Sequence, residues 1–113
     1  MNIETLRTHH CRPLKGPQHR LDHSRSSELL ALLGGWEFGP EQSDIRKRFK
    51  FDNFMQALAF VNAAGWIAEQ ENHHPDLELG WGRCLVRFST HDVGGLSMND
   101  FICAAKVHAL FEH

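Results

Sequence analysis

Three histidines could carry chemistry in this chain. His73 and His74 are adjacent and directly precede Pro75, and His91 follows later in the sequence. Imidazole can gain or lose a proton near neutral pH, so it suits general acid–base catalysis as well as metal binding. Glu69 lies four positions before His73, so on a helix its carboxylate could touch and orient the ring. A surface Glu–His pair that closes a helix is the simpler interpretation of these two residues alone.

A metal site is the weaker of the two chemical interpretations. Proline disfavours helical geometry in the residue before it, so His74 should leave the chain in a different direction from His73. Side chains that diverge in this way are poorly placed to coordinate the same metal ion, but they can line two walls of a pocket. Zinc sites also favour short, recognisable ligand pairs, and His73, His74, His91 and Asp100 do not form such pairs. We therefore expect no bound metal.

Composition and charge narrow the classes of function. The chain has 113 residues, which predicts one domain, and its net charge of −2 gives no electrostatic reason to expect binding to nucleic acid. No apolar run is long enough to span a membrane, and the first residues lack the apolar core of a secretion signal. The three cysteines show no CxxC spacing, which is typical of free thiols in a reducing compartment. A cytoplasmic protein is expected.

The hydrophobic pattern predicts an α+β fold. Residues 1–23 are polar and without an apolar period, so we expect a flexible N-terminal extension before a single domain over 24–113. The domain should contain helices from about 24 to 33, over 54–72 and over 98–110, and strands over 36–38, 45–51, 77–79 and 83–90. The order α-β-β-α-β-β-α predicts a four-stranded, mainly antiparallel sheet with three helices packed on one face.

Local signals fix the ends of the two long helices. Asp52 is a suitable N-cap for the helix over 54–72, and Ser97 with Asp100 forms a capping-box pattern before the last helix. The helix over 54–72 is apolar on more than one side and includes Trp66. Such a helix either lies centrally in the fold or buries its second side in an oligomer.

The same residues resemble the signature of a known family. The pattern E-x3-H-H-P-x5-W-x9-H-x8-D is carried by Glu69, His73, His74, Pro75, Trp81, His91 and Asp100, and it resembles that of the pterin-4a-carbinolamine dehydratases. The similarity extends over roughly residues 27 to 111 and includes Gly35-Trp36, 45–75 and 87–100. Residues 1–23 have no counterpart in the pattern.

The resemblance implies a lyase. Members of that family dehydrate 4a-hydroxytetrahydropterin to quinonoid dihydropterin in tetrahydrobiopterin recycling, with a base at N5, an acid at the C4a hydroxyl, and no metal or redox cofactor. By resemblance, His73 and His91 would exchange protons with the substrate while His74 binds and orients it. Glu69 would orient His73, and Asp100 would close the site and hold His91. Trp36 and Trp81 would line the pterin pocket or its edge, supported by Pro75.

Two other functions stay open at this point. Family members form dimers or tetramers, so we expect a homodimer or homotetramer, and a non-catalytic dimerisation or interaction module on the same scaffold is the main alternative. The intact histidines argue against that alternative, because an interface does not require imidazoles at those positions. A histidine-ligated metal protein is the third possibility, and sensitivity to a chelator would identify it.

Overall fold

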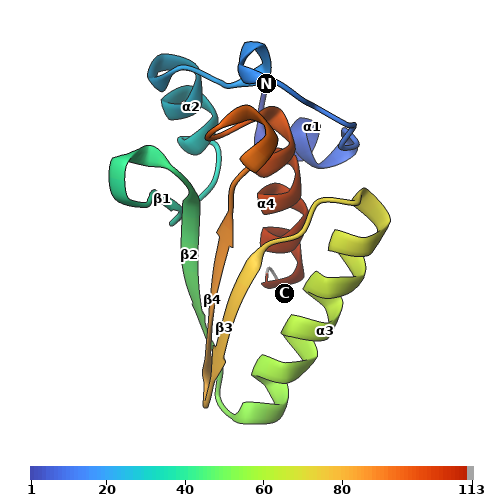
Figure 1. The fold of residues 1–113 in the computed structure, drawn as a ribbon. Helices are drawn as coiled ribbons and strands as arrows, with labels where there is room; N and C mark the ends of the chain where they lie inside the picture. The colour runs from blue at the N-terminus through green and yellow to red at the C-terminus, as the bar shows by residue number, and fades with distance from the viewer. Residues whose placement is uncertain (112–113) are drawn as a thin grey trace.

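A four-stranded sheet carries two long helices on one face (Figure 1). The computed structural model describes residues 1–111. Its strands run antiparallel in the order β1-β2-β4-β3. They comprise β1 (Glu37–Phe38), β2 (Ile45–Lys50), β3 (Asp76–Gly80) and β4 (Arg83–Phe88). The expected fold class and the order α-β-β-α-β-β-α are confirmed.

Four α-helices accompany the sheet. They are α1 (Ile3–Thr8), α2 (His23–Leu30), α3 (Phe54–Glu71) and α4 (Met98–Phe111), with short 3-10 turns at Pro17–His19, Pro40–Gln42 and His91–Val93. Helix α1 and the 3-10 turns are additions to the expected order. Over residues 1–111, none of the helices has both the length and the apolar character that crossing a membrane requires.

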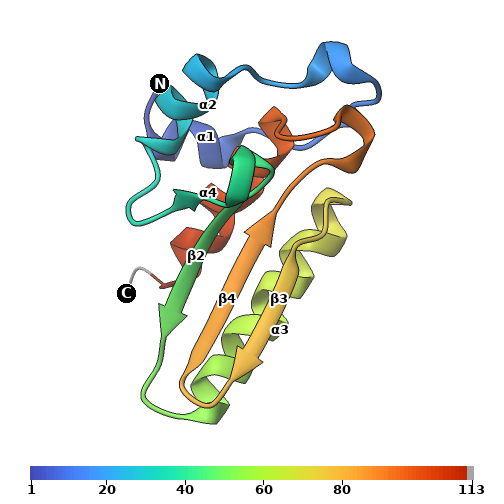
Figure 2. The ribbon, with the colours of Figure 1, turned by 60° about the vertical axis from the view of Figure 1, so that its left-hand side comes forward.

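The sheet buries one face and exposes the other. Along β2, Ile45 and Phe49 point into the core, and they pair across the sheet with Phe88 and Cys84 of β4, which are also buried. Strand side chains alternate between the two faces, so the intervening Arg48 lies on the open face. Figure 2 shows β2, β4 and β3 side by side, with α3 and α4 behind them. The expected division into an apolar and a basic face is confirmed.

Helix α3 ends one residue earlier than its sequence suggests. It begins after Asn53, whose side chain accepts the Gln56 N–H at 2.8 Å, so the cap lies one residue beyond the expected Asp52. At its other end Asn72 adopts the left-handed conformation, with φ 52° and ψ 42°. Asparagine tolerates that conformation better than most residues and often terminates helices. His73 therefore lies outside the helix.

Helix α4 forms the centre of the core, and its start follows the expected capping box. The Ser97 N–H donates to Asp100 Oδ2 at 2.9 Å, and the Asn99 N–H donates to Ser97 Oγ at 3.2 Å. These contacts satisfy amide groups that have no partner within the helix. All residues from 99 to 105 are buried.

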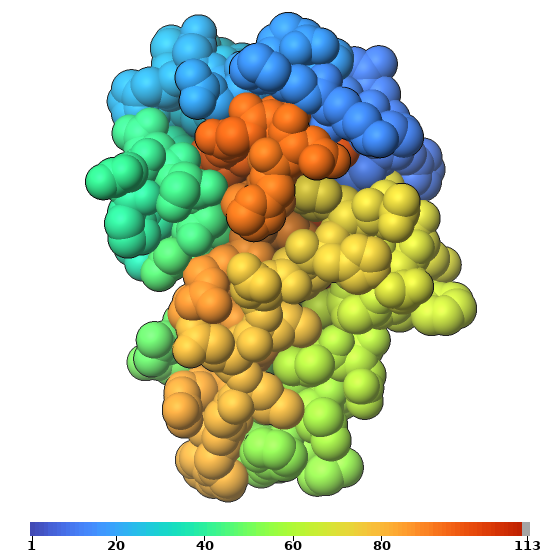
Figure 3. All heavy atoms as spheres, viewed as in Figure 1, coloured from blue at the N-terminus to red at the C-terminus, as the bar shows by residue number. Residues whose placement is uncertain are grey.

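The N-terminal residues pack on the domain, which differs from the expected flexible extension. Leu6 has no exposed surface, and Leu14 is also buried. Arg7 Nε donates to the Ala105 carbonyl at 3.1 Å, and Lys106 Nζ donates to the Arg7 carbonyl at 2.6 Å. In Figure 3 the blue N-terminal segment lies against the orange loop before α4. The hydrophobic pattern does not reveal this packing, because the few leucines of the N-terminal segment contact a helix that is distant in sequence.

This packing predicts a stability effect at Leu6. Leu6→Ala should lower the free energy of unfolding by about 2–5 kcal/mol, because it removes a fully buried side chain and leaves a cavity. Urea denaturation followed by tryptophan fluorescence measures the change. Leu79→Ala is the matched control, because Leu79 is exposed on β3 and its loss should cost much less. Equal effects in the two variants would contradict the packing of α1 on α4.

Candidate active site

A buried carboxylate organises the candidate site. Asp100, in the first turn of α4, has no exposed surface. Its Oδ2 accepts hydrogen bonds from the Ser97 N–H at 2.9 Å and from Thr90 Oγ1 at 2.8 Å. Its Oδ1 lies 2.6 Å from His73 Nε2. The same residue therefore caps α4 and holds an imidazole.

His73 is held from two directions. Besides the contact with Asp100, its ring stacks on Phe88 with 6.0 Å between centroids and 12° between planes. A carboxylate only accepts hydrogen bonds, so Nε2 carries the hydrogen, and in the neutral ring Nδ1 has a lone pair free to take a proton. Within residues 1–111 no side chain or backbone group bonds Nδ1. The side chain is 12% exposed, so the ring is fixed but still accessible.

The two expected carboxylate–histidine pairings are wrong. Glu69 Oε1 lies 2.7 Å from His74 Nε2 instead of contacting His73, and Asp100 holds His73 instead of His91. The left-handed turn at Asn72 is the reason, because it ends the helix before His73 and turns that ring toward α4. His74 faces outward, with 53% of its side chain exposed. Its contact with Glu69 is a surface pair, which adds little stability.

His73 and His91 each line a cavity. His73 lines a cavity of about 370 Å³ that Thr90 and Asp92 also line. This volume lies within the range for small-molecule sites. His91 is exposed and lines a neighbouring cavity of about 340 Å³, which Thr90 also borders. The structure therefore places His73 and His91 on either side of Thr90, and His74 lines neither cavity.

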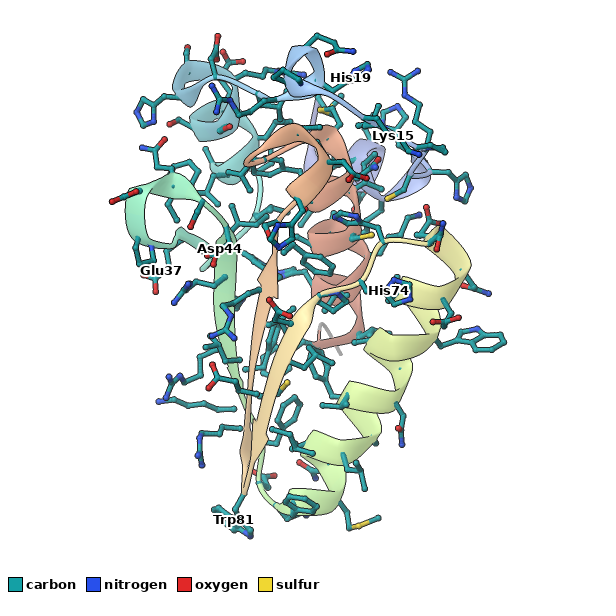
Figure 4. The ribbon with its side chains drawn as sticks, viewed as in Figure 1. Lys15, His19, Glu37, Asp44, His74 and Trp81 are labelled. Atoms are coloured by element: carbon teal, nitrogen blue, oxygen red, sulfur yellow. The ribbon has the colours of Figure 1, made fainter. Side chains whose placement is uncertain are left out.

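The two tryptophans lie away from both cavities. Trp81 is 69% exposed at the turn between β3 and β4, and Figure 4 shows it at the opposite end of the sheet from His74. Strand β3, five residues long, lies between them and by itself spans about 16 Å, at roughly 3.3 Å per residue. Trp36 is a core residue, 6% exposed, whose Nε1 donates to His108 Nδ1 at 3.3 Å. Within a single chain neither residue lines the cavities, so this expectation is wrong. Pro75 sits between His74 and β3, where it shapes the backbone.

Sequence reasoning missed one wall of the His73 cavity. Residues 11–15 line it, together with Glu71 at the end of α3 and Asn99 at the start of α4. No local signal identified this wall, because its residues contact partners far along the chain. Over residues 1–111 no group of three or more His, Cys, Asp or Glu side chains is placed to hold a metal ion.

Comparison with known proteins gives the family. The family described as Pterin 4 alpha carbinolamine dehydratase matches residues 19–110. A protein of Xanthomonas campestris pv. campestris (strain 8004), whose name assigns it provisionally to the pterin-4-alpha-carbinolamine dehydratases, is 53% identical over 103 residues. These residues cover 91% of this chain and 87% of the relative.

Two solved structures are similar in fold. A crystal structure from Brucella melitensis, described as a transcriptional coactivator/pterin dehydratase, aligns with a TM-score of 0.78 and 33% identity, covering 81% of this chain and 98% of that one. A pterin dehydratase-like protein described as a RuBisCO assembly factor of the alpha-carboxysome aligns with a TM-score of 0.58 and 25% identity, covering 67% of this chain and 88% of that one. The family match spans most of the chain and includes every residue of the histidine pattern. The chain therefore belongs to the pterin-4a-carbinolamine dehydratase family.

Proposed function

We propose that this protein dehydrates 4a-hydroxytetrahydropterin to quinonoid dihydropterin and water. One observation carries the proposal. The His73 ring is fixed by a buried carboxylate at 2.6 Å and borders a cavity of about 370 Å³, while its second nitrogen has no partner in the described chain. An oriented imidazole beside a cavity of this size is what general acid–base catalysis on a small molecule needs.

The reaction needs two proton transfers. The substrate carries a hydrogen on N5 and a hydroxyl on the neighbouring C4a. A base removes the N5 proton, a double bond forms between N5 and C4a, and an acid protonates the hydroxyl as it leaves as water. The atoms and electrons balance without an oxidant or reductant, so imidazoles are sufficient for these steps.

The three histidines differ in exposure and in hydrogen-bond partners, and these differences suggest their roles. His73 has the most defined position, and we assign it one proton transfer, with Asp100 as its positioning residue. His91 lies across Thr90, is exposed and lines the neighbouring cavity, so it is assigned the other transfer. His74 is open to solvent and paired with Glu69, which suits binding and orienting the substrate. The pterin ring would then lie over Thr90, the residue common to both cavities.

We further propose that the protein acts in tetrahydrobiopterin recycling in the cytoplasm. We expect it to form a homodimer or homotetramer. Phe54, Met55 and Trp66 of α3 are exposed at 41%, 68% and 66%. Large apolar side chains gathered on one helix favour burial against another subunit.

A second candidate is a non-catalytic interaction module. The same exposed side chains of α3 favour it, and one structural neighbour is described by an assembly role. Such a module has no use for an imidazole locked by a buried carboxylate, so we rank it below the dehydratase. An assay for dehydration separates the two candidates directly.

The first prediction concerns the division of labour between the adjacent histidines. His73→Ala should lower kcat by about 10²–10⁴, the usual contribution of one general acid or base, while His74→Ala should mainly raise KM. A coupled assay that generates the 4a-hydroxy compound and follows its dehydration measures both constants. His9→Ala is the matched control, because His9 is exposed and lies outside both cavities.

Two results would count against this assignment. Full activity in His73→Ala would remove His73 from the mechanism. No acceleration by the wild-type protein over the uncatalysed reaction would instead favour the interaction module.

The second prediction is that activity does not depend on a bound metal ion. Dialysis against EDTA should leave kcat unchanged, because the proposed proton transfers run through imidazole and carboxylate groups alone. Readdition of zinc should not stimulate the dialysed protein. Loss of activity on dialysis, with recovery on adding zinc, would support the metal-dependent alternative.

A further inference from the structure

Residues 11–15, here called the N-terminal wall, border the His73 cavity. Cys11, Arg12 and Lys15 all line it, together with Thr90 and Asp92, and the Gly16 N–H directly after Lys15 donates to the Asp92 carbonyl at 2.9 Å. The wall precedes residue 19, where the match to the family begins, so the family pattern does not account for it. Figure 4 shows Lys15 on the N-terminal segment, far from the Trp81 end of the sheet.

The wall is attached to the same helices that carry the site. The Cys11 N–H donates to Glu71 Oε1 at 2.7 Å, at the end of α3. Asn99, at the start of α4, makes two hydrogen bonds to Arg12: its Oδ1 accepts the backbone N–H at 3.2 Å, and its Nδ2 donates to the carbonyl at 2.7 Å. Asn99 is adjacent to Asp100, and Glu71 lies two residues before His73, so the wall has a defined position relative to the His73–Asp100 pair.

Both oxygens of the Glu71 carboxylate take part in this attachment. Burial by itself would raise the pKa of Glu71, but hydrogen bonds from the Cys11 N–H and the His10 ring, together with nearby Lys106, outweigh burial and lower that pKa. The charged carboxylate therefore holds the wall. The wall itself brings the charged side chains of Arg12 and Lys15 to the cavity, which Gln70 and Asn72 also line.

The chemistry of pterins indicates which part of the substrate meets the wall. The reacting atoms are N5 and C4a, and C6, which carries the variable substituent of natural pterins, is bonded to N5. With His73 at the reacting atoms, a substituent on C6 can extend into the cavity toward the wall. Arg12 and Lys15 can only donate hydrogen bonds, whereas the Asp92 carboxylate in the same lining accepts them. Hydroxyl groups both donate and accept, so a hydroxylated substituent fits this mixed lining.

We propose that the N-terminal wall binds the C6 substituent of the substrate and selects pterins with a hydroxylated side chain, with Lys15 and Arg12 as specificity-determining residues and Asn99 as the residue that positions the wall. This inference rests on the proposed dehydratase function.

A kinetic comparison of two substrates tests the proposal. The 4a-hydroxy forms of a 6-methyl and of a 6-(dihydroxypropyl) tetrahydropterin share the pterin ring, and only the second has a longer, hydroxylated substituent. The wild-type protein should prefer the dihydroxypropyl compound by about tenfold in kcat/KM, the ratio expected for one hydrogen bond to a charged group. Lys15→Ala should lose most of that preference through KM, with the constants for the methyl compound unchanged. Lys15→Arg should retain the preference.

Matched variants control for charge and for folding. Lys50→Ala removes an exposed lysine at the far end of β2 and should leave both substrates unaffected. Asn99→Ala should lower the preference as Lys15→Ala does, while Asn62→Ala, on the exposed side of α3, should not. An equal preference in wild type and Lys15→Ala, with normal dehydration of both substrates, would overturn the role of the wall and leave the proposed function intact.

Alkylation of Cys11 provides a readout that does not depend on catalysis. Cys11 is partly exposed on the wall, and its Sγ lies 3.4 Å from the Sγ of the buried Cys103. Cys84 is buried and serves as the internal control. A stable 7,8-dihydropterin with the dihydroxypropyl group should slow modification of Cys11 by iodoacetamide, measured by peptide mass spectrometry, and the 6-methyl analogue should slow it less.

The two experiments together separate the possible failures. Protection of Cys11 in a protein that does not accelerate dehydration would refute the dehydratase function while supporting pterin binding at the wall. Equal modification rates with and without the dihydropterin would overturn the wall proposal whatever the activity.

Discussion

The contact between Asp100 and His73 joins the three parts of the chain that build the site. A carboxylate without hydrogen-bond donors is costly to bury, so Asp100 can occupy the core only where donors surround it. Those donors come from the segment after β4, from the start of α4 and from the corner after α3, through Thr90, Ser97 and His73. The contact that satisfies the carboxylate therefore also brings these segments together and orients an imidazole.

The end of α3 decides what the adjacent histidines do. Asn72 reverses the chain in the left-handed conformation, and Pro75 keeps the following residues extended. His73 consequently turns toward α4, where its ring stacks on Phe88, while His74 stays on the surface beside Glu69. Two neighbouring residues of the same type thus acquire different burial, different partners and different chemical capacities.

The N-terminal segment extends the domain and completes a cavity. Its buried leucines, Leu6 and Leu14, anchor it, and its backbone is bonded to Glu71 and Asn99. The wall is bonded to Glu71 and Asn99 and not to His73 or Asp100 themselves, so substitutions of its outward side chains change the lining of the cavity while leaving the His73–Asp100 contact in place.

The sequence by itself determined the features that depend on neighbouring residues. The alternation of Ile45 and Phe49 with basic residues predicted the two-faced strand β2, and Ser97 with Asp100 predicted the start of α4. The spacing of the histidine pattern predicted the family that the comparison then gave. These signals are local or periodic, so they can be read without knowing how the chain folds back on itself.

Only the tertiary structure decided which groups meet. It gave Glu69 and Asp100 other histidine partners than expected, placed Trp36 in the core and Trp81 at the tip of a hairpin, and packed the N-terminal segment on α4. Each outcome depends on the direction in which a side chain leaves a turn, or on contacts between residues distant in sequence. A change of backbone conformation at one residue, such as the left-handed turn at Asn72, changes the direction of the chain that follows. The spacing of residues along the sequence does not indicate that direction.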